Sequence, residues 1–123
     1  MTIQECYIQM KADYEDVLKR LGTDALVERF LQKFLNDSSF NNLLDAFEKN
    51  DMDAAFAAAH TLKGVSMNLG FSYLGEVSSK LTEALRDKCV EKDIKPLFFE
   101  VQEAYKNTIN TIKQYQTEKL SDK

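Results

Sequence analysis

The chain has 123 residues, the length of one domain, and 44% of them are hydrophobic, enough to fill a single core. Its formal net charge of −4 and its lack of any lysine- or arginine-rich run argue against a nucleic-acid-binding module, which needs a basic patch. Only four glycines and one proline are present, too few turn formers for a fold of many short strands. We therefore predict an all-α fold of long helices.

The sequence also bounds the environment of the protein. It contains no apolar run of membrane-spanning length, and we expect no secretory leader and no membrane partner. Cys6 and Cys89 belong to no motif, so we expect both to be free thiols. Two isolated thiols are typical of a reducing compartment, which predicts a cytoplasmic location.

Apolar residues recur at intervals of three and four along almost the whole chain, the spacing of amphipathic helices. In chain order, these stripes predict helices over residues 3–21, 23–35, 40–47, 51–69, 72–85 and 93–115. Asp51 and Ser72 are the expected N-caps of the fourth and fifth helices, and residues 36–39 are a break or kink. Gly70 ends the fourth helix, and Pro96 falls within the first turn of the last one, where proline is tolerated.

Four long amphipathic helices with short connections bury their stripes most simply as an antiparallel up-down four-helix bundle. The additional N-terminal helix is expected to pack across one end or side. No repeat, low-complexity segment or linker divides the chain, so we expect one domain over residues 1–123, with a bundle core at about 23–116. A bundle completed within one chain favours a monomer.

The segment between Asp53 and Glu76 does not look like an ordinary surface helix. In a helical projection one face forms a core stripe of Ala55, Ala58, Ala59, Leu62, Val65, Ser66 and Leu69. The opposite face centres on His60 and is small or apolar at most positions: Asp53, Phe56, Ala57, Lys63, Gly64 and Met67. Exposed apolar surface around one polar group is typical of a docking site. The alternative is a helix buried on all sides, with His60 as a core histidine.

Two neighbours of His60 favour the docking interpretation. Glycine inside a helix costs about 1 kcal/mol relative to alanine, so Gly64 should have a reason to be there. It lies one turn beyond His60 on the same face, where the missing side chain would let another protein's backbone approach the imidazole. Lys63 has no acidic residue four positions away and can offer its charge to a visiting anion.

At these residues the sequence resembles a known family. AHTLKGVSMNLG is similar to the signature of histidine-containing phosphotransfer (HPt) domains, in which lysine follows the phosphorylated histidine at the third position and glycine at the fourth. YEDVLKRLGTDALVERFLQKFL resembles the first two helices of that family. The resemblance implies that His60 is the phospho-accepting nucleophile, that Lys63 steadies the phosphoryl oxygens and that Gly64 admits the partner. Phe56, Ala57 and Met67 would then line the partner-docking surface.

Some polar residues near the motif stay without a firm role. Ser66 and Asn68 match the longer form of the motif, but Ser66 lies on the predicted core face, which favours a structural role. The family often places a polar side chain of the next helix near the histidine. Ser78 and Thr82 are candidates, and the sequence does not choose between them.

The resemblance implies a phosphorelay intermediate of two-component signal transduction. His60 would accept a phosphoryl group from a receiver-domain aspartate and pass it to another, with response regulators and a hybrid sensor kinase as partners. The receiver would supply Mg²⁺ and most of the charge neutralisation, so the chain would need no cofactor or metal of its own. Thr61 stands where dimerising sensor-kinase histidines are followed by an acidic residue, and no glycine-rich nucleotide loop exists. We therefore expect no ATP-dependent kinase activity.

Three other functions compete with the relay. A non-catalytic helical adaptor would use the apolar face around His60 only to bind a partner helix. A bundle metalloprotein needs several inward-facing ligands, whereas the chain has one histidine and no Glu-x-x-His pair. A degenerate HPt-like regulator is disfavoured because His60, Lys63 and Gly64 are all intact.

Overall fold

The computed structural model describes residues 1–121, which contain helices and no strand. The all-α prediction is therefore confirmed. In chain order the helices of this part are α1 (Ile3–Gln9), α2 (Tyr14–Leu21), α3 (Asp24–Leu35), α4 (Ser39–Glu48), α5 (Met52–Asn68), α6 (Ser72–Arg86) and α7 (Glu91–Ser121). None of them is both long and apolar enough to cross a membrane.

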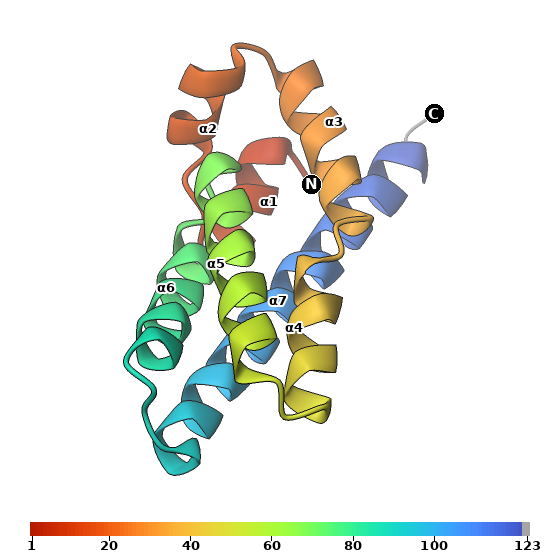
Figure 1. Cartoon of the computed structure of the whole chain (residues 1–123). Coiled ribbons are helices and arrows are strands. Elements are labelled where there is room, and N and C mark those ends of the chain that lie inside the picture. Colours follow the sequence, from red (N-terminus) through yellow and green to blue (C-terminus); the bar gives the residue numbers. More distant parts are fainter. Residues whose placement is uncertain (122–123) are drawn as a thin grey trace.

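Helices α4 to α7 surround the main core and alternate in direction (Figure 1). Helix α5 packs between α4 and α6, and α7 runs behind α5 with α6 as its main neighbour. Aromatic rings join α7 to α4: the Phe40 and Tyr105 centroids lie 4.1 Å apart, and those of Phe47 and Phe98 lie 4.3 Å apart. Such stacked pairs stabilise the interface beyond the apolar area that they bury.

The N-terminal region differs from the single helix predicted over residues 3–21. The chain forms α1 and α2, and the residues between them leave helical geometry at Lys11, which has a φ of +54°. Asp13 begins α2 by accepting a hydrogen bond from the amide of Asp16, at 3.0 Å. Its own amide donates to the carbonyl of Gly70, at 2.7 Å. A hydrogen bond to a distant part of the chain thus replaces a helical one, which the apolar spacing could not reveal.

Other predicted boundaries hold or shift by a few residues. The break at residues 36–39 is confirmed, with the Asp37 carboxylate accepting from the amide of Ser39 at 2.8 Å. Ser72 is not the N-cap of α6, because Phe71 takes that position. Phe71 is fully buried, and its ring centroid lies 5.0 Å from that of Phe34. Helix α7 begins at Glu91, so Pro96 lies just past its first turn.

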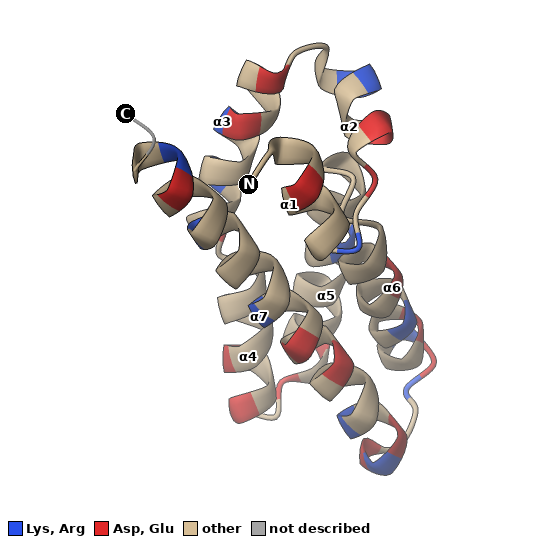
Figure 2. Ribbon diagram, turned by 180° about the vertical axis from the view of Figure 1, so that it is seen from behind, with Lys and Arg blue, Asp and Glu red and all other residues tan. Residues whose placement is uncertain are grey.

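Helix α1 lies against α7 on the back of the molecule (Figure 2). The side-chain amide of Asn107 donates to the carbonyl of Gln9, at 2.9 Å. In the same view, acidic and basic residues are scattered over the helices without a continuous basic stripe. Both cysteines are free; Cys6 is buried, which raises the pKa of its thiol to about 12, and Cys89 is exposed.

Candidate functional site

Helix α5 is a well-terminated platform for His60. At its start the Asp51 carboxylate accepts a hydrogen bond from the amide of Ala54, at 3.0 Å. At its end Gly70 adopts a φ of +75°, and the amide of Phe71 donates to the carbonyl of Ser66 at 2.8 Å. This is the usual left-handed glycine termination of a helix. A side chain at Gly70 would also collide with the Asp13 carbonyl oxygen, 2.6 Å from an ideal Cβ.

The two faces of α5 separate as the helical projection predicted. Val65 is half-buried, and the other predicted core residues are buried: Ala55, Ala58, Ala59, Leu62, Ser66 and Leu69. His60 lies on the opposite face and is exposed. Within residues 1–121 its imidazole makes no hydrogen bond, and the nearest aromatic ring, that of Phe56, lies 6.1 Å away between centroids. Both ring nitrogens are therefore free to react with a visiting group.

Gly64 and Lys63 border the imidazole on the same face. Gly64 is exposed, and an added Cβ would meet no atom within 4 Å. Packing within the described part of the chain therefore does not require glycine at this point. Lys63 is half-buried and forms no ion pair within residues 1–121. Its ammonium group is available to an anion brought to His60.

The three predicted docking residues lie around His60 along α5. Phe56 is half-buried, and the guanidinium carbon of Arg86 from α6 lies 5.3 Å from its ring centre. Ala57 is exposed. Met67 is 42% exposed and lies over buried Gly75 of α6, where an ideal Cβ would approach its sulfur to 2.9 Å. Arg86 and Gly75 thus shape this surface, and the apolar spacing gave no signal for either.

Hollows open beside both ends of α5. A cavity of about 740 Å³ opens beside Phe56 and Arg86 and is walled by α4 and α7 residues such as Phe47 and Phe98. A groove of about 470 Å³ lies toward the other end, between α2, α3 and Val65 of α5. Neither hollow is lined by His60 itself, so the exposed imidazole lies outside both.

The polar residues left unassigned do not reach the imidazole. Ser66 and Ser78 are buried, and their hydroxyls have no hydrogen-bond partner within residues 1–121. The Thr82 hydroxyl is also buried and donates to the carbonyl of Ser78 on its own helix, at 2.7 Å. No side chain of α6 therefore donates to His60 in this structure. The same described residues contain no cluster of three or more His, Cys, Asp or Glu that could hold a metal ion.

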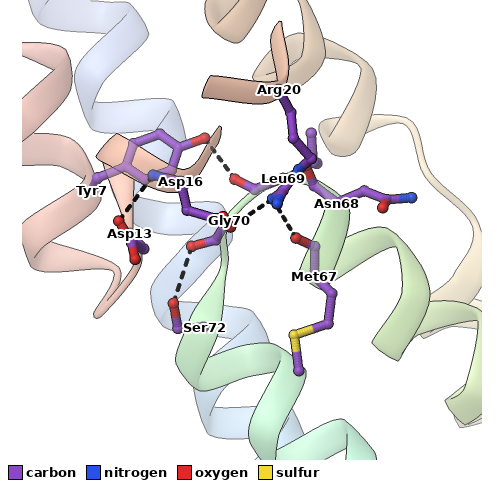
Figure 3. A network of polar contacts seen from close by, with 9 residues as sticks. All are labelled: Tyr7, Asp13, Asp16, Arg20, Met67, Asn68, Leu69, Gly70 and Ser72. Carbon is purple, nitrogen blue, oxygen red and sulfur yellow. Dashed lines mark hydrogen bonds and ion pairs between the residues drawn. The ribbon is translucent and has the colours of Figure 1, made fainter. Parts of the chain in front are cut away.

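Polar side chains from α1 and α2 hold the C-terminal end of α5 (Figure 3). The buried Tyr7 hydroxyl donates to the carbonyl of Leu69, at 2.8 Å. Arg20 donates from Nε to the carbonyl of Asn68 at 3.1 Å and from Nη2 to that of Met67 at 2.6 Å. The last carbonyls of a helix lack partners within the helix, so these contacts satisfy groups that would otherwise need water. Helical periodicity gives no signal for this network, because its contacts join residues far apart in the sequence.

The comparisons with known proteins give one positive finding. The family model described as the Hpt domain matches residues 25–115, about three quarters of the chain, and this range contains His60, Lys63 and Gly64. No curated protein and no solved structure matches the chain significantly. Hpt domains carry out histidine phosphotransfer in phosphorelay signalling and interact with the receiver domains of response regulators. With an all-helical fold and a match over most of its length, the chain belongs to the Hpt domain family.

Proposed function

We propose that this protein is a phosphorelay intermediate that carries a phosphoryl group on His60. The observation that carries the proposal is an exposed imidazole, without an intramolecular hydrogen bond in residues 1–121, at the centre of α5. It is bordered by Lys63, which forms no ion pair within residues 1–121, and by open space at Gly64. A receiver domain that brings its phosphorylated aspartate to this face would meet the nucleophile directly.

The proposed chemistry is a reversible exchange between two nucleophiles. A neutral imidazole nitrogen attacks the phosphorus of the receiver's acyl phosphate, a P–N bond forms, and the P–O bond to the aspartate breaks so that a carboxylate leaves. In the second step the carboxylate of another receiver attacks the same phosphorus, and the imidazole is the leaving group. Charge neutralisation and positioning dominate such transfers. Lys63 would provide part of that charge, and we expect the receiver to provide Mg²⁺.

The docking surface that we propose consists of Phe56, Ala57, Gly64 and Met67 around His60. These side chains are small or apolar and exposed or half-buried, which fits a partner that excludes water from the reacting groups. Gly64 would let the partner's backbone come close. We propose that the donor is the receiver domain of a hybrid sensor kinase, that the final acceptor is a response regulator, and that the chain acts as a monomer.

The proposal is tested by incubating the chain with a purified receiver domain that carries a radiolabelled aspartyl phosphate. We expect an acid-labile, base-stable label to appear on this chain, to be absent from His60→Gln and to persist in the control Asn110→Gln, since Asn110 is exposed on α7. Labelled ATP alone should give no signal, because Hpt domains are carriers rather than kinases.

Persistent labelling of His60→Gln would overturn the assignment. The adaptor alternative makes a different prediction: the wild-type chain and His60→Gln should both bind the receiver domain, and neither should become labelled.

A further inference from the structure

Arg20 is a side chain of α2 that reaches the C-terminal end of α5, the helix that carries His60. Its guanidinium group binds two consecutive carbonyls at the end of α5, those of Met67 and Asn68, at 2.6 and 3.1 Å. The same Nη2 atom forms an ion pair with the Asp16 carboxylate one turn earlier in α2, at 2.8 Å. The guanidinium group is thus held both by its own helix and by the end of α5 (Figure 3).

One of the two carbonyls belongs to the proposed docking surface. Met67 and Asn68 are both exposed, and Met67 is one of the proposed docking residues. The Met67 side chain can settle against α6 only because Gly75 leaves room for it. A small shift of the last turn of α5 would move this side chain relative to His60.

Lysine could not hold this turn in the same way. The planar guanidinium presents several N–H donors in a fixed fork, whereas the lysine ammonium is a compact charge on a flexible stem. Hydrogen bonds from a charged donor to a carbonyl are also stronger than neutral ones. The geometry of the contact, rather than charge alone, therefore distinguishes Arg20 from neighbouring Lys19, which is exposed and makes no ion pair within the described residues.

We infer that Arg20 is a positioning residue for the partner-docking surface: by binding the Met67 and Asn68 carbonyls, it fixes the end of α5 at which the receiver domain meets Met67. This inference rests on the proposed function, because it assigns Arg20 a role in the same encounter. It also gives a role to a residue outside the family match, which begins at residue 25. Arg20 touches neither the imidazole nor the transferred group.

The test compares Arg20→Ala, Arg20→Lys and the control Lys19→Ala in transfer from a phosphorylated receiver domain that labels the wild-type chain. For Arg20→Ala we expect KM for the phospho-receiver to rise about five- to tenfold with kcat nearly unchanged, since the loss concerns docking. Arg20→Lys should show most of the same rise, and Lys19→Ala should behave as wild type. Labelling of His60 by phosphoramidate, a small donor that needs no docking surface, should be equal in all four proteins.

A second readout follows the α5 terminus directly. In Arg20→Ala the amides of Gly70 and Phe71, which close this helix end, should exchange with solvent faster than in wild type, while that of Asp87 at the end of α6 should not change. An unchanged KM in Arg20→Ala, complete rescue by lysine, or weaker phosphoramidate labelling would each overturn the inference. A receiver that fails to label even the wild-type chain would instead overturn the proposed function, before any variant is compared.

Discussion

At Gly64 the requirements of stability and of the proposed function differ: helix stability favours alanine, whereas partner docking favours glycine. It lies in the interior of α5, where alanine is more stable by roughly 0.5–1 kcal/mol, and no atom of the described chain would obstruct a methyl group there. The sequence alone predicted an unfilled position beside His60. The structure adds that the internal packing of the protein does not require it.

We therefore expect Gly64→Ala to raise the free energy of unfolding by up to about 1 kcal/mol, because it removes the entropic cost of a helical glycine. Gly64→Leu should leave helicity nearly unchanged and slow transfer from a phosphorylated receiver strongly, since its side chain would occupy the approach to the imidazole. Chemical denaturation and single-turnover transfer measure the two effects. Loss of fold in Gly64→Ala would contradict this account and show that the glycine is needed for packing.

Met67 shows where single-residue reasoning from the sequence ends. Its place on the face with His60 follows from helical periodicity, which is a local property. Its contact with Gly75 and the hold of Arg20 on its carbonyl join residues far apart in the sequence, so no spacing within α5 could reveal them. The sequence therefore predicted which residues share the face, but not what fixes their positions.

At the scale of helices, α3 and α7 are joined by a cluster around Glu28. The Glu28 carboxylate accepts hydrogen bonds from the Lys119 ammonium and from the Tyr115 hydroxyl, the latter at 2.5 Å. These two contacts, that of Lys119 first, hold the pKa of Glu28 below its ordinary value. The apolar stripe predicts a last helix that ends at residue 115, whereas α7 continues to Ser121 and brings Lys119 to this cluster.

A lowered carboxyl pKa in the folded state predicts stability that is present above the unfolded pKa of about 4.3 and is lost as the pH falls through the folded value. We expect Glu28→Gln to lower the free energy of unfolding at pH 7 by about 0.5–1 kcal/mol, a modest effect because the site is only partly buried. Denaturation at pH 7 and pH 3 measures this difference, which should shrink at the lower pH.

The control for this experiment is Glu103→Gln, which removes an exposed pair with Lys106 at 4.0 Å and should cost almost nothing. If Glu28→Gln had the same effect at both pH values, the contribution would come from packing rather than from the charge of the carboxylate.

Helix α5 and its neighbours show how far element prediction reaches. The bounds of α5 agree within about a residue with the prediction, because Asp51 and Gly70 are strong local signals at its two ends. The prediction of a single N-terminal helix over residues 3–21 was wrong because no local signal marks the break between α1 and α2. The apolar spacing continues across residues 10–13, while hydrogen bonds to the α5–α6 turn pull the backbone out of helical geometry there.

In the whole molecule, the segment before residue 25 is joined by hydrogen bonds to the end of α5 and the start of α6. Tyr7 and Arg20 bind carbonyls at the end of α5, and the amide of Tyr73 in α6 donates to the carbonyl of Lys11 at 3.1 Å. Composition and periodicity were sufficient to predict an all-α chain. They could not predict that its N-terminal part supports the helix that carries His60, because that arrangement depends on tertiary contacts.

The central claim is that His60 carries the phosphoryl group, and locating that group on the chain tests it most directly. Trypsin cleavage after Lys49 and Lys63 yields the peptide of residues 50–63, which contains the only histidine of the protein. After transfer from a phosphorylated receiver, mass spectrometry at alkaline pH should find one phosphoryl group on this peptide, with fragment ions that assign it to His60. A phosphoryl group assigned to Asp51, Asp53, Thr61 or any residue of another peptide would contradict the account.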